Sequence, residues 1–186
     1  MFSLRLDGRQ GSRALPSLLA ALLGGGADAS DDPGLLLELD RDRFEVVARD
    51  RRSGDLGPRI RIALGSPARK TPSGDYPIGR VILNPGWHPS NEAVAAGAEP
   101  EPPSTTSPMG AAKIPFAEMG SIALHGGGDP LLLGKAVSGG CVRARDSDLL
   151  RIVAWLLAQD ALALPEVQPG GEVHRSFRRP IRLRIP

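Results

Sequence analysis

Residues 121–150 read SIALHGGGDPLLLGKAVSGGCVRARDSDLL and hold the only cysteine of the chain, Cys141, with one of its three histidines, His125. The apolar start predicts a short strand that ends on His125, and the glycine-rich segment after it predicts a loop that can turn back. A thiol is a strong nucleophile only as the thiolate, so a catalytic cysteine needs a base or a positive charge close by. We therefore expect Cys141 to be a nucleophile and His125 its base, with a buried, inert cysteine as the alternative.

The two glycines before the cysteine add a second feature of catalytic loops. Gly139 and Gly140 lack a Cβ atom, so the backbone before the sulfur can adopt unusual angles and approach a ligand closely. Its N–H groups can then stabilise a substrate oxygen as an oxyanion hole.

Composition narrows the class of protein. The chain has 186 residues, of which 41% are hydrophobic and 24% charged, and this length predicts a single domain with a short extension. No apolar run is long enough to span a membrane. The net charge of +2 gives no overall attraction to nucleic acid. A lone cysteine excludes an internal disulfide and a multi-cysteine zinc site, and we expect neither a metal nor a cofactor.

Alternating apolar and polar residues predict a mostly β domain. Its mixed sheet would fold into a sandwich-like or barrel-like core, with one main helix after the nucleophile. The expected strands cover residues 35–39 and 43–49, joined by a tight turn at residues 40–42, then residues 59–64, a segment ending near Leu83, and residues 181–185. Apolar residues at helical spacing after Cys141 predict the helix, with Asp146 or Ser147 as its N-cap.

Two segments lie outside this pattern. Residues 1–33 combine arginines with a short apolar run, which is typical of a secretory signal or of a small helix that packs on the domain. We therefore expect the domain itself to cover residues 34–186. Residues 88–118 are rich in proline without clear periodicity, which predicts a functional loop or flap, or else a disordered insert.

The basic segment from residue 174 to 186 has two interpretations. Its five arginines could attract an anionic polymer. Ile181, Leu183 and Ile185 alternate with Arg182 and Arg184, however, and this alternation predicts a strand with one solvated face.

Several ordered blocks resemble one known family. An H-G pair followed by S-x-G-C-hydrophobic-R, the segment KTPSGDYPIGRVILNPGWHP and the short block SPMG are similar to motifs of the L,D-transpeptidases, the YkuD-type catalytic domains of bacterial cell-wall enzymes. The resemblance runs from about Leu35 to Leu150. It implies the family's mostly β fold, a location in the cell envelope, a monomer, and peptidoglycan stem peptides as partners.

The resemblance also implies residue roles. Cys141 would be the nucleophile, His125 the general base, and the carbonyl of Gly126 would orient the imidazole. Ser138, Gly140 and Arg143 would have roles at the site, and Arg143 would either bind a substrate carboxylate or brace the loop. From the residues themselves we expect Gly139 to line the loop beside the substrate, and Trp87 to be either an apolar wall of the cleft or a core tryptophan. Many members carry histidine where this chain has Gly139, and this difference removes a possible polar contact.

The implied reaction attacks the carbonyl before a terminal D-alanine and transfers the peptide from a thioester to an amine. Three alternatives remain open at this stage. They are an L,D-carboxypeptidase, a papain-like peptidase in which His174 is the base, and a wall-binding module with an inert Cys141.

Overall fold

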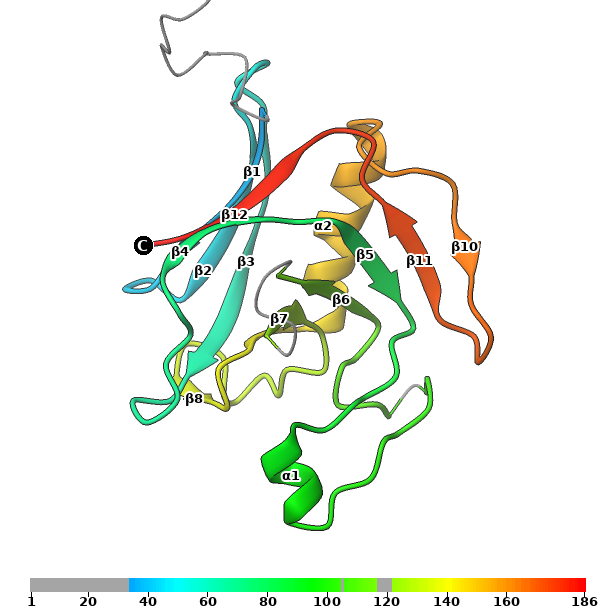
Figure 1. Cartoon of the computed structure of the whole chain (residues 1–186). Helices are drawn as coiled ribbons and strands as arrows, with labels where there is room; N and C mark the ends of the chain where they lie inside the picture. The colour runs from blue at the N-terminus through cyan, green and yellow to red at the C-terminus, as the bar shows by residue number, and fades with distance from the viewer. Residues whose placement is uncertain (1–33, 105, 117–121) are drawn as a thin grey trace, which may run out of the picture. The chain divides into compact units, whose positions relative to one another are not determined.

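Figure 1 shows the computed structural model of the chain, which describes residues 34–104, 106–116 and 122–186. Residues 1–33, for which a signal or packing segment was predicted, lie outside this part of the chain. In chain order the elements are β1 (Leu35–Asp40), β2 (Glu45–Asp50), β3 (Leu56–Gly65), β4 (Gly74–Pro77), β5 (Arg80–Leu83), α1 (Asn91–Ala95), β6 (Ala112–Pro115), β7 (Ala123–His125), β8 (Ala136–Ser138), β9 (Val142–Ala144), α2 (Asp146–Ala158), β10 (Glu166–Val167), β11 (Val173–Ser176) and β12 (Ile181–Ile185).

The strands form one hydrogen-bonded order. That order is β10-β11-β5-β6-β7-β9-β3-β2-β1-β12-β4, and β8 pairs with β3 off this path. Three pairs are parallel, namely β1 with β12, β3 with β8, and β7 with β9. The other described pairs are antiparallel, so the sheet is mixed and the predicted mostly β architecture is confirmed.

The first hairpin follows the predicted pattern with a shifted turn. β1 continues to Asp40, and the turn falls on residues 41–44 instead of residues 40–42. Oδ1 of Asp40 accepts hydrogen bonds from the N–H groups of Asp42 and Arg43, both at 3.0 Å. A short side chain that bonds to the backbone two or three residues on is a common way to stabilise such a turn.

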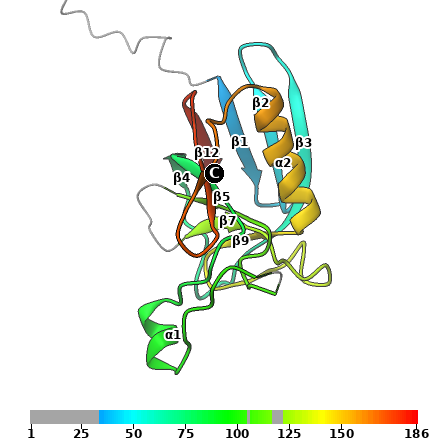
Figure 2. The same cartoon turned by 90° about the vertical axis from the view of Figure 1, so that its right-hand side faces the viewer.

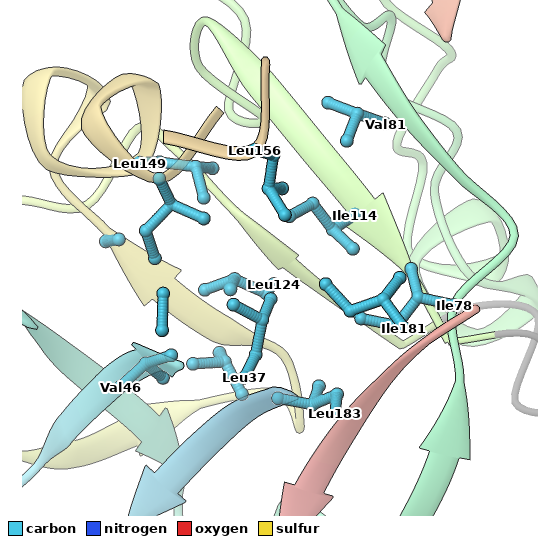
Figure 3. Packing of buried hydrophobic residues seen from close by; sticks show 14 of the residues in the cluster. Leu37, Val46, Ile78, Val81, Ile114, Leu124, Leu149, Leu156, Ile181 and Leu183 are labelled. Carbon is cyan, nitrogen blue, oxygen red and sulfur yellow. The ribbon is translucent and has the colours of Figure 1, made fainter. Parts of the chain in front are cut away.

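The sheet curls around a single apolar core. Tyr76 of β4, at one end of the strand order, and Val81 of β5, near the other end, belong to the same buried cluster. Tyr76 stacks on Phe116, which follows β6, with ring centroids 5.3 Å apart. Figure 3 shows Leu156 directed toward Ile114 inside this cluster. Because the sheet curls, the strands in the middle of the strand order turn one face toward this core.

Helix α2 covers the core beside β3, as Figure 2 shows. Its buried residues lie at helical spacing, as predicted: Leu149, Ile152, Val153 and Leu156. The predicted N-cap was wrong, because Arg145 takes that position and makes no side-chain cap bond. Asp146 lies in the first turn, and its Oδ1 accepts from the N–H groups of Ala111 and Gly127 at 2.8 and 2.9 Å. Asp146 lies one position after the N-cap, and its carboxylate bonds to two other segments instead.

Strand β12 confirms the amphipathic interpretation of the basic segment. Its alternate residues from Ile181 to Ile185 are buried, while Arg182 and Arg184 both bond to Asp75 of β4, at 2.6 and 3.2 Å. The remaining arginines of the segment, Arg175, Arg178 and Arg179, also donate hydrogen bonds within the chain.

The proline-rich stretch contains regular structure where it is described. Helix α1 lies away from the sheet in both views (Figures 1 and 2), and residues 112–115 form β6. The backbones of Trp87 and Glu101 exchange two hydrogen bonds of 2.9 Å across the base of the stretch. Residues 105, 117 and 118 are not described. None of the helices in the described ranges is long and apolar enough to cross a membrane.

Candidate active site

The pairing of β7 with β9 brings the two predicted catalytic residues to one face of the sheet. In this parallel pair Leu124 lies opposite Val142 and His125 lies opposite Arg143. Leu124 and Val142 point into the core. Because successive side chains in a strand alternate between faces, His125 and Arg143 share the opposite face. Cys141 directly precedes β9, so the register brings it close to His125 at the start of the neighbouring strand.

One hydrogen bond fixes the form of His125. The ring is buried, and its Nδ1 lies 2.7 Å from the carbonyl oxygen of Gly126. A carbonyl oxygen only accepts, so Nδ1 carries the proton and, in the neutral ring, Nε2 is left as the acceptor. This is the tautomer that can take a proton from a thiol.

The surroundings keep His125 neutral. Burial lowers its pKa to about 4, and the positive charges of Arg143 and Lys113 act in the same direction. Lys113 lies opposite His125 on β6, just as Arg143 does on β9, so the ring has a cation on either side in the sheet. At neutral pH the imidazole is therefore present as the base.

The loop that carries the nucleophile is held by its own serine. The hydroxyl of Ser138 donates to the carbonyl of Cys141 at 2.6 Å and accepts from the N–H of Gly140 at 3.1 Å. Gly140 has φ +121°, in the region that favours glycine. Ser138 is buried and Cys141 is half-buried, so the serine braces the loop from behind while the cysteine reaches its surface.

Thr71 is a site residue that sequence reasoning missed. Its buried hydroxyl donates to the carbonyl of Gly140 and accepts from the N–H of Gly65, both at 2.9 Å. In a trans peptide the C=O and the following N–H point in opposite directions. Holding the Gly140 carbonyl toward Thr71 therefore directs the Cys141 N–H away from Thr71. Thr71 stands in the T-P-x-G block of the sequence, which was the available signal.

Asp146 also belongs to the site, although sequence reasoning assigned it only to the cap of helix α2. Through Ala111 and Gly127 its carboxylate joins the segment before β6 to the loop that follows His125. Gly126, whose carbonyl oxygen contacts the imidazole, directly precedes Gly127, which donates one of these hydrogen bonds. Asp146 thus holds the backbone that orients His125.

No grouping of His, Cys, Asp and Glu within residues 34–104, 106–116 and 122–186 is arranged to hold a metal ion. The described chemistry at this site is that of a cysteine, a neutral histidine and oriented backbone groups.

The comparison with known families agrees with this geometry. The sequence matches the family model YkuD, the L,D-transpeptidase catalytic domain, over residues 37–173. The chain belongs to this family. The matched range contains every site residue described above, and the resemblance read from the sequence motifs is confirmed. No curated protein matches the sequence.

Solved structures share the YkuD-family fold. The NMR structure of the catalytic domain from the E. faecium L,D-transpeptidase is 15% identical, with TM-score 0.50, and the match covers 80% of this chain and 95% of that domain. The same domain acylated by ertapenem is 16% identical, with TM-score 0.50, and the match covers 75% and 95%. An L,D-transpeptidase from Mycobacterium smegmatis is 16% identical, with TM-score 0.45 and 81% of this chain covered. The chain spans 58% of that protein's length.

The other residues predicted to contact substrate at this YkuD-family site are Gly139, Arg143 and Trp87. The place of a Cβ at Gly139 is open, with only Nη1 of Arg69 near it, at 3.9 Å. The buried Nε of Arg143 has no hydrogen-bond partner among the described residues. Trp87 is half-buried where the proline-rich stretch begins. No described contact joins Trp87 to the nucleophile loop.

His174 is remote from Cys141 in this YkuD-family domain. It lies on β11, and three strands separate β11 from β9 in the sheet order. At about 4.8 Å between neighbouring strands this is roughly 19 Å. Nε2 of His174 contacts Oε2 of Glu172 at 3.0 Å. This position disfavours the papain-like alternative.

Proposed function

We propose that the chain is the catalytic part of a peptidoglycan L,D-transpeptidase that forms a thioester on Cys141. Membership of the YkuD family supports the class of reaction. What supports the assignment of residues is the pairing of β7 with β9, which brings His125 next to the strand that begins directly after Cys141, with Nε2 of the neutral imidazole as acceptor.

The first half-reaction acylates the cysteine. Sγ of Cys141 bonds to the carbonyl carbon between the diamino acid and the terminal D-alanine of a stem peptide, and the thiol proton passes to Nε2 of His125. The Cys141 N–H, directed by the Thr71 bond to the preceding carbonyl, stabilises the oxyanion. The C–N bond then breaks, and His125 gives its proton to the amine of the departing D-alanine.

The low pKa of His125 suits the second of these proton transfers. An imidazolium with a pKa of about 4 is a strong acid, so it protonates a leaving amine readily. Lys113 and Arg143, which flank the ring, lie on the sheet face where negative charge develops on sulfur and oxygen.

The second half-reaction transfers the peptide. An acceptor amine attacks the thioester carbonyl and loses a proton to His125, the C–S bond breaks, and the proton returns to Cys141. The product is a new amide, either a crosslink between stems or the anchor of a protein. Water in place of the amine would give hydrolysis, which is the L,D-carboxypeptidase reaction.

Contacts of the substrate follow from the same face. Arg143 presents a guanidinium beside His125 and is assigned to a substrate carboxylate. Gly139 and Gly140 let the peptide approach the loop backbone, which Ser138 braces, and Trp87 supplies an apolar wall. In this proposal residues 34–186 are the catalytic domain and act in the cell envelope.

The basic segment gives no support to the alternative of a wall-binding module. Each of its five arginines already makes a hydrogen bond inside the chain, four of them to the carboxylates of Asp50, Asp75 and Asp160. Little of its charge is left for a polymer.

Product analysis tests the proposal directly. Purified disaccharide tetrapeptide is incubated with the protein and the products are identified by mass spectrometry. We expect loss of D-alanine and formation of a crosslinked dimer, and neither product with Cys141→Ala or His125→Ala. His174→Ala is the matched control and should retain activity. Equal product formation by Cys141→Ala would refute the thioester.

A carbapenem gives an independent test of the nucleophile. The E. faecium domain was solved acylated by ertapenem. We expect the same drug to add its mass to the intact protein and not to Cys141→Ala. Absence of an adduct on the folded, reduced protein would contradict the assignment.

A further inference from the structure

A groove outside the residues assigned above lies where β3 and β9 lead to helix α2. It is lined by Arg61, Pro130, Leu131, Leu133, Arg145 and Asp148 and has a volume of about 460 Å³. Neither Cys141 nor His125 lines it. The loop between His125 and β8 forms one wall, and the beginning of α2 forms another.

The sheet register places the two arginines of this groove close together. Ile62 lies opposite Ala144 and Ala63 lies opposite Arg143 in the antiparallel pair of β3 and β9. Arg61 precedes Ile62 on β3 and Arg145 follows Ala144, the last residue of β9, so both arginines lie at this end of the strand pair and both line the groove. Like charges held close together repel, so an anion bound between the two arginines would be favourable.

Neither guanidinium has a hydrogen-bond or ion-pair partner among the residues that the structure describes. Each has an acid close in the structure, but that acid is engaged elsewhere. Glu45, opposite Arg61 on β2, bonds to Arg59 at 2.6 Å. Asp148, in the groove, bonds to Arg151 at 3.2 Å. The arginines Arg49, Arg59, Arg182 and Arg184, also on strands, are all paired with carboxylates.

Apolar side chains complete the groove. Leu133 is buried, whereas the side chain of Leu131 is 79% exposed beside the two guanidiniums. An exposed leucine next to two unpaired cations fits a ligand that has both an anionic group and an apolar body. Two neighbouring guanidiniums match the paired oxygens of a carboxylate or a phosphate.

Charge distribution favours a peptide carboxylate over a polyanion. A phosphodiester polymer needs a row of cations, but the groove offers two, together with Asp148 of α2, and the chain has a net charge of only +2. Arg145 follows Cys141 by four residues, with β9 between them, so the two lie at most about 13 Å apart. An extended peptide of about four residues spans this distance.

We infer that this groove binds a carboxylate of an acidic stem peptide whose reacting group lies at Cys141. The inference rests on the proposed function and adds a second anchoring site to it. Arg61 and Arg145 hold the carboxylate, and the leucines contact the aliphatic part of the peptide.

The test uses binding without turnover. Isothermal titration measures the affinity of an acidic tetrapeptide stem for Cys141→Ala and for the same protein carrying Arg61→Gln and Arg145→Gln. We expect the added pair of substitutions to weaken binding at least about tenfold, because charged hydrogen bonds are lost. A stem whose carboxylates are amidated should bind both proteins equally. Arg49→Gln, on β2 and outside the groove, is the control and should leave the affinity unchanged.

Other outcomes overturn the inference. Equal affinity of the two proteins for the acidic stem, or no binding to either, would refute the groove as a carboxylate site, and so would tighter binding of a polyphosphate probe than of the stem. The proposed function fails separately, through absence of the thioester in the mass experiment.

Stability provides a second readout that does not depend on a ligand. Because Arg61→Gln removes a like-charge contact, its unfolding midpoint in low salt should equal or exceed that of the unchanged protein. A marked loss of stability would mean that Arg61 already has a structural partner and would contradict the inference.

Discussion

Replacing Thr71 by valine removes one hydroxyl and tests how the nucleophile loop is held. Valine has nearly the same shape, so no cavity forms, but the N–H of Gly65 and the carbonyl of Gly140 both lose their partner. Both glycines are buried. A buried backbone group left without a partner costs about 1 to 3 kcal/mol, so we expect a loss of at least about 2 kcal/mol in the free energy of unfolding.

The same substitution should slow acylation. Without the Thr71 bond the Gly140 carbonyl is no longer fixed, and the Cys141 N–H loses its set direction. Complete loss of one oxyanion donor lowers rates by roughly 10²–10³, so we expect a decrease between about tenfold and that limit.

Urea unfolding followed by tryptophan fluorescence measures the first effect, and the rate of ertapenem adduct formation measures the second. Thr71→Ser keeps the hydroxyl and loses only a methyl group, so it should cost about 1 kcal/mol and leave the acylation rate near its original value. If valine and serine at this position gave the same acylation rate, the hydroxyl would have no role in directing the loop.

Three further predictions concern His125 and the proline-rich stretch. Since the pKa of His125 is about 4 and its neutral form is the base, acylation should persist from neutral pH down to about pH 5 and fall only near pH 4; a fall centred near 6.5 would contradict the buried position. Unfolded histidine binds a proton below about 6.5 and folded His125 only below about 4, so stability should be complete above pH 6.5 and fall by about 3 kcal/mol as the pH drops to 4, a slope that His125→Gln should lack. Glu92 of α1 pairs with Arg69, which lies beside Gly139, so Glu92→Gln should shift products from crosslinked dimer toward hydrolysed tripeptide with little change in stability. Glu99→Gln in the same stretch is the control and should leave the product ratio unchanged. An unchanged ratio with Glu92→Gln would mean that α1 does not cover the site.

Patterns of local sequence predicted the strands and the main helix because one buried face leaves a period of two or of about 3.6 residues. The alternation in residues 181–185 and the spacing from Leu149 to Leu156 are of this kind. The proposed pairing of His125 with Cys141 has a related basis, since strand, glycine loop and cysteine lie close together in the chain.

Long-range polar contacts left no such pattern. Thr71 and Gly140 are 69 residues apart, and a single threonine before a proline looks like an ordinary turn residue. The role of Asp146 was misassigned for the same reason, because an acid at the start of a helix fits a cap locally, whereas its partners are Ala111 and Gly127. The proximity of Arg61 and Arg145 depends on sheet register, which single-strand patterns do not determine.

The parallel pair of β1 with β12 has a consequence for how the domain forms during synthesis. Leu35 pairs with Ile181, so one edge of the first strand has no neighbour until nearly the whole described domain has left the ribosome. Pairings of such wide sequence separation form slowly. Until then β1 presents the apolar segment LLLELD with an open edge, which other chains can join. A truncation within β12 removes the partner of β1 and should therefore lower the yield of native protein through aggregation, although β12 contributes no residue to the active site.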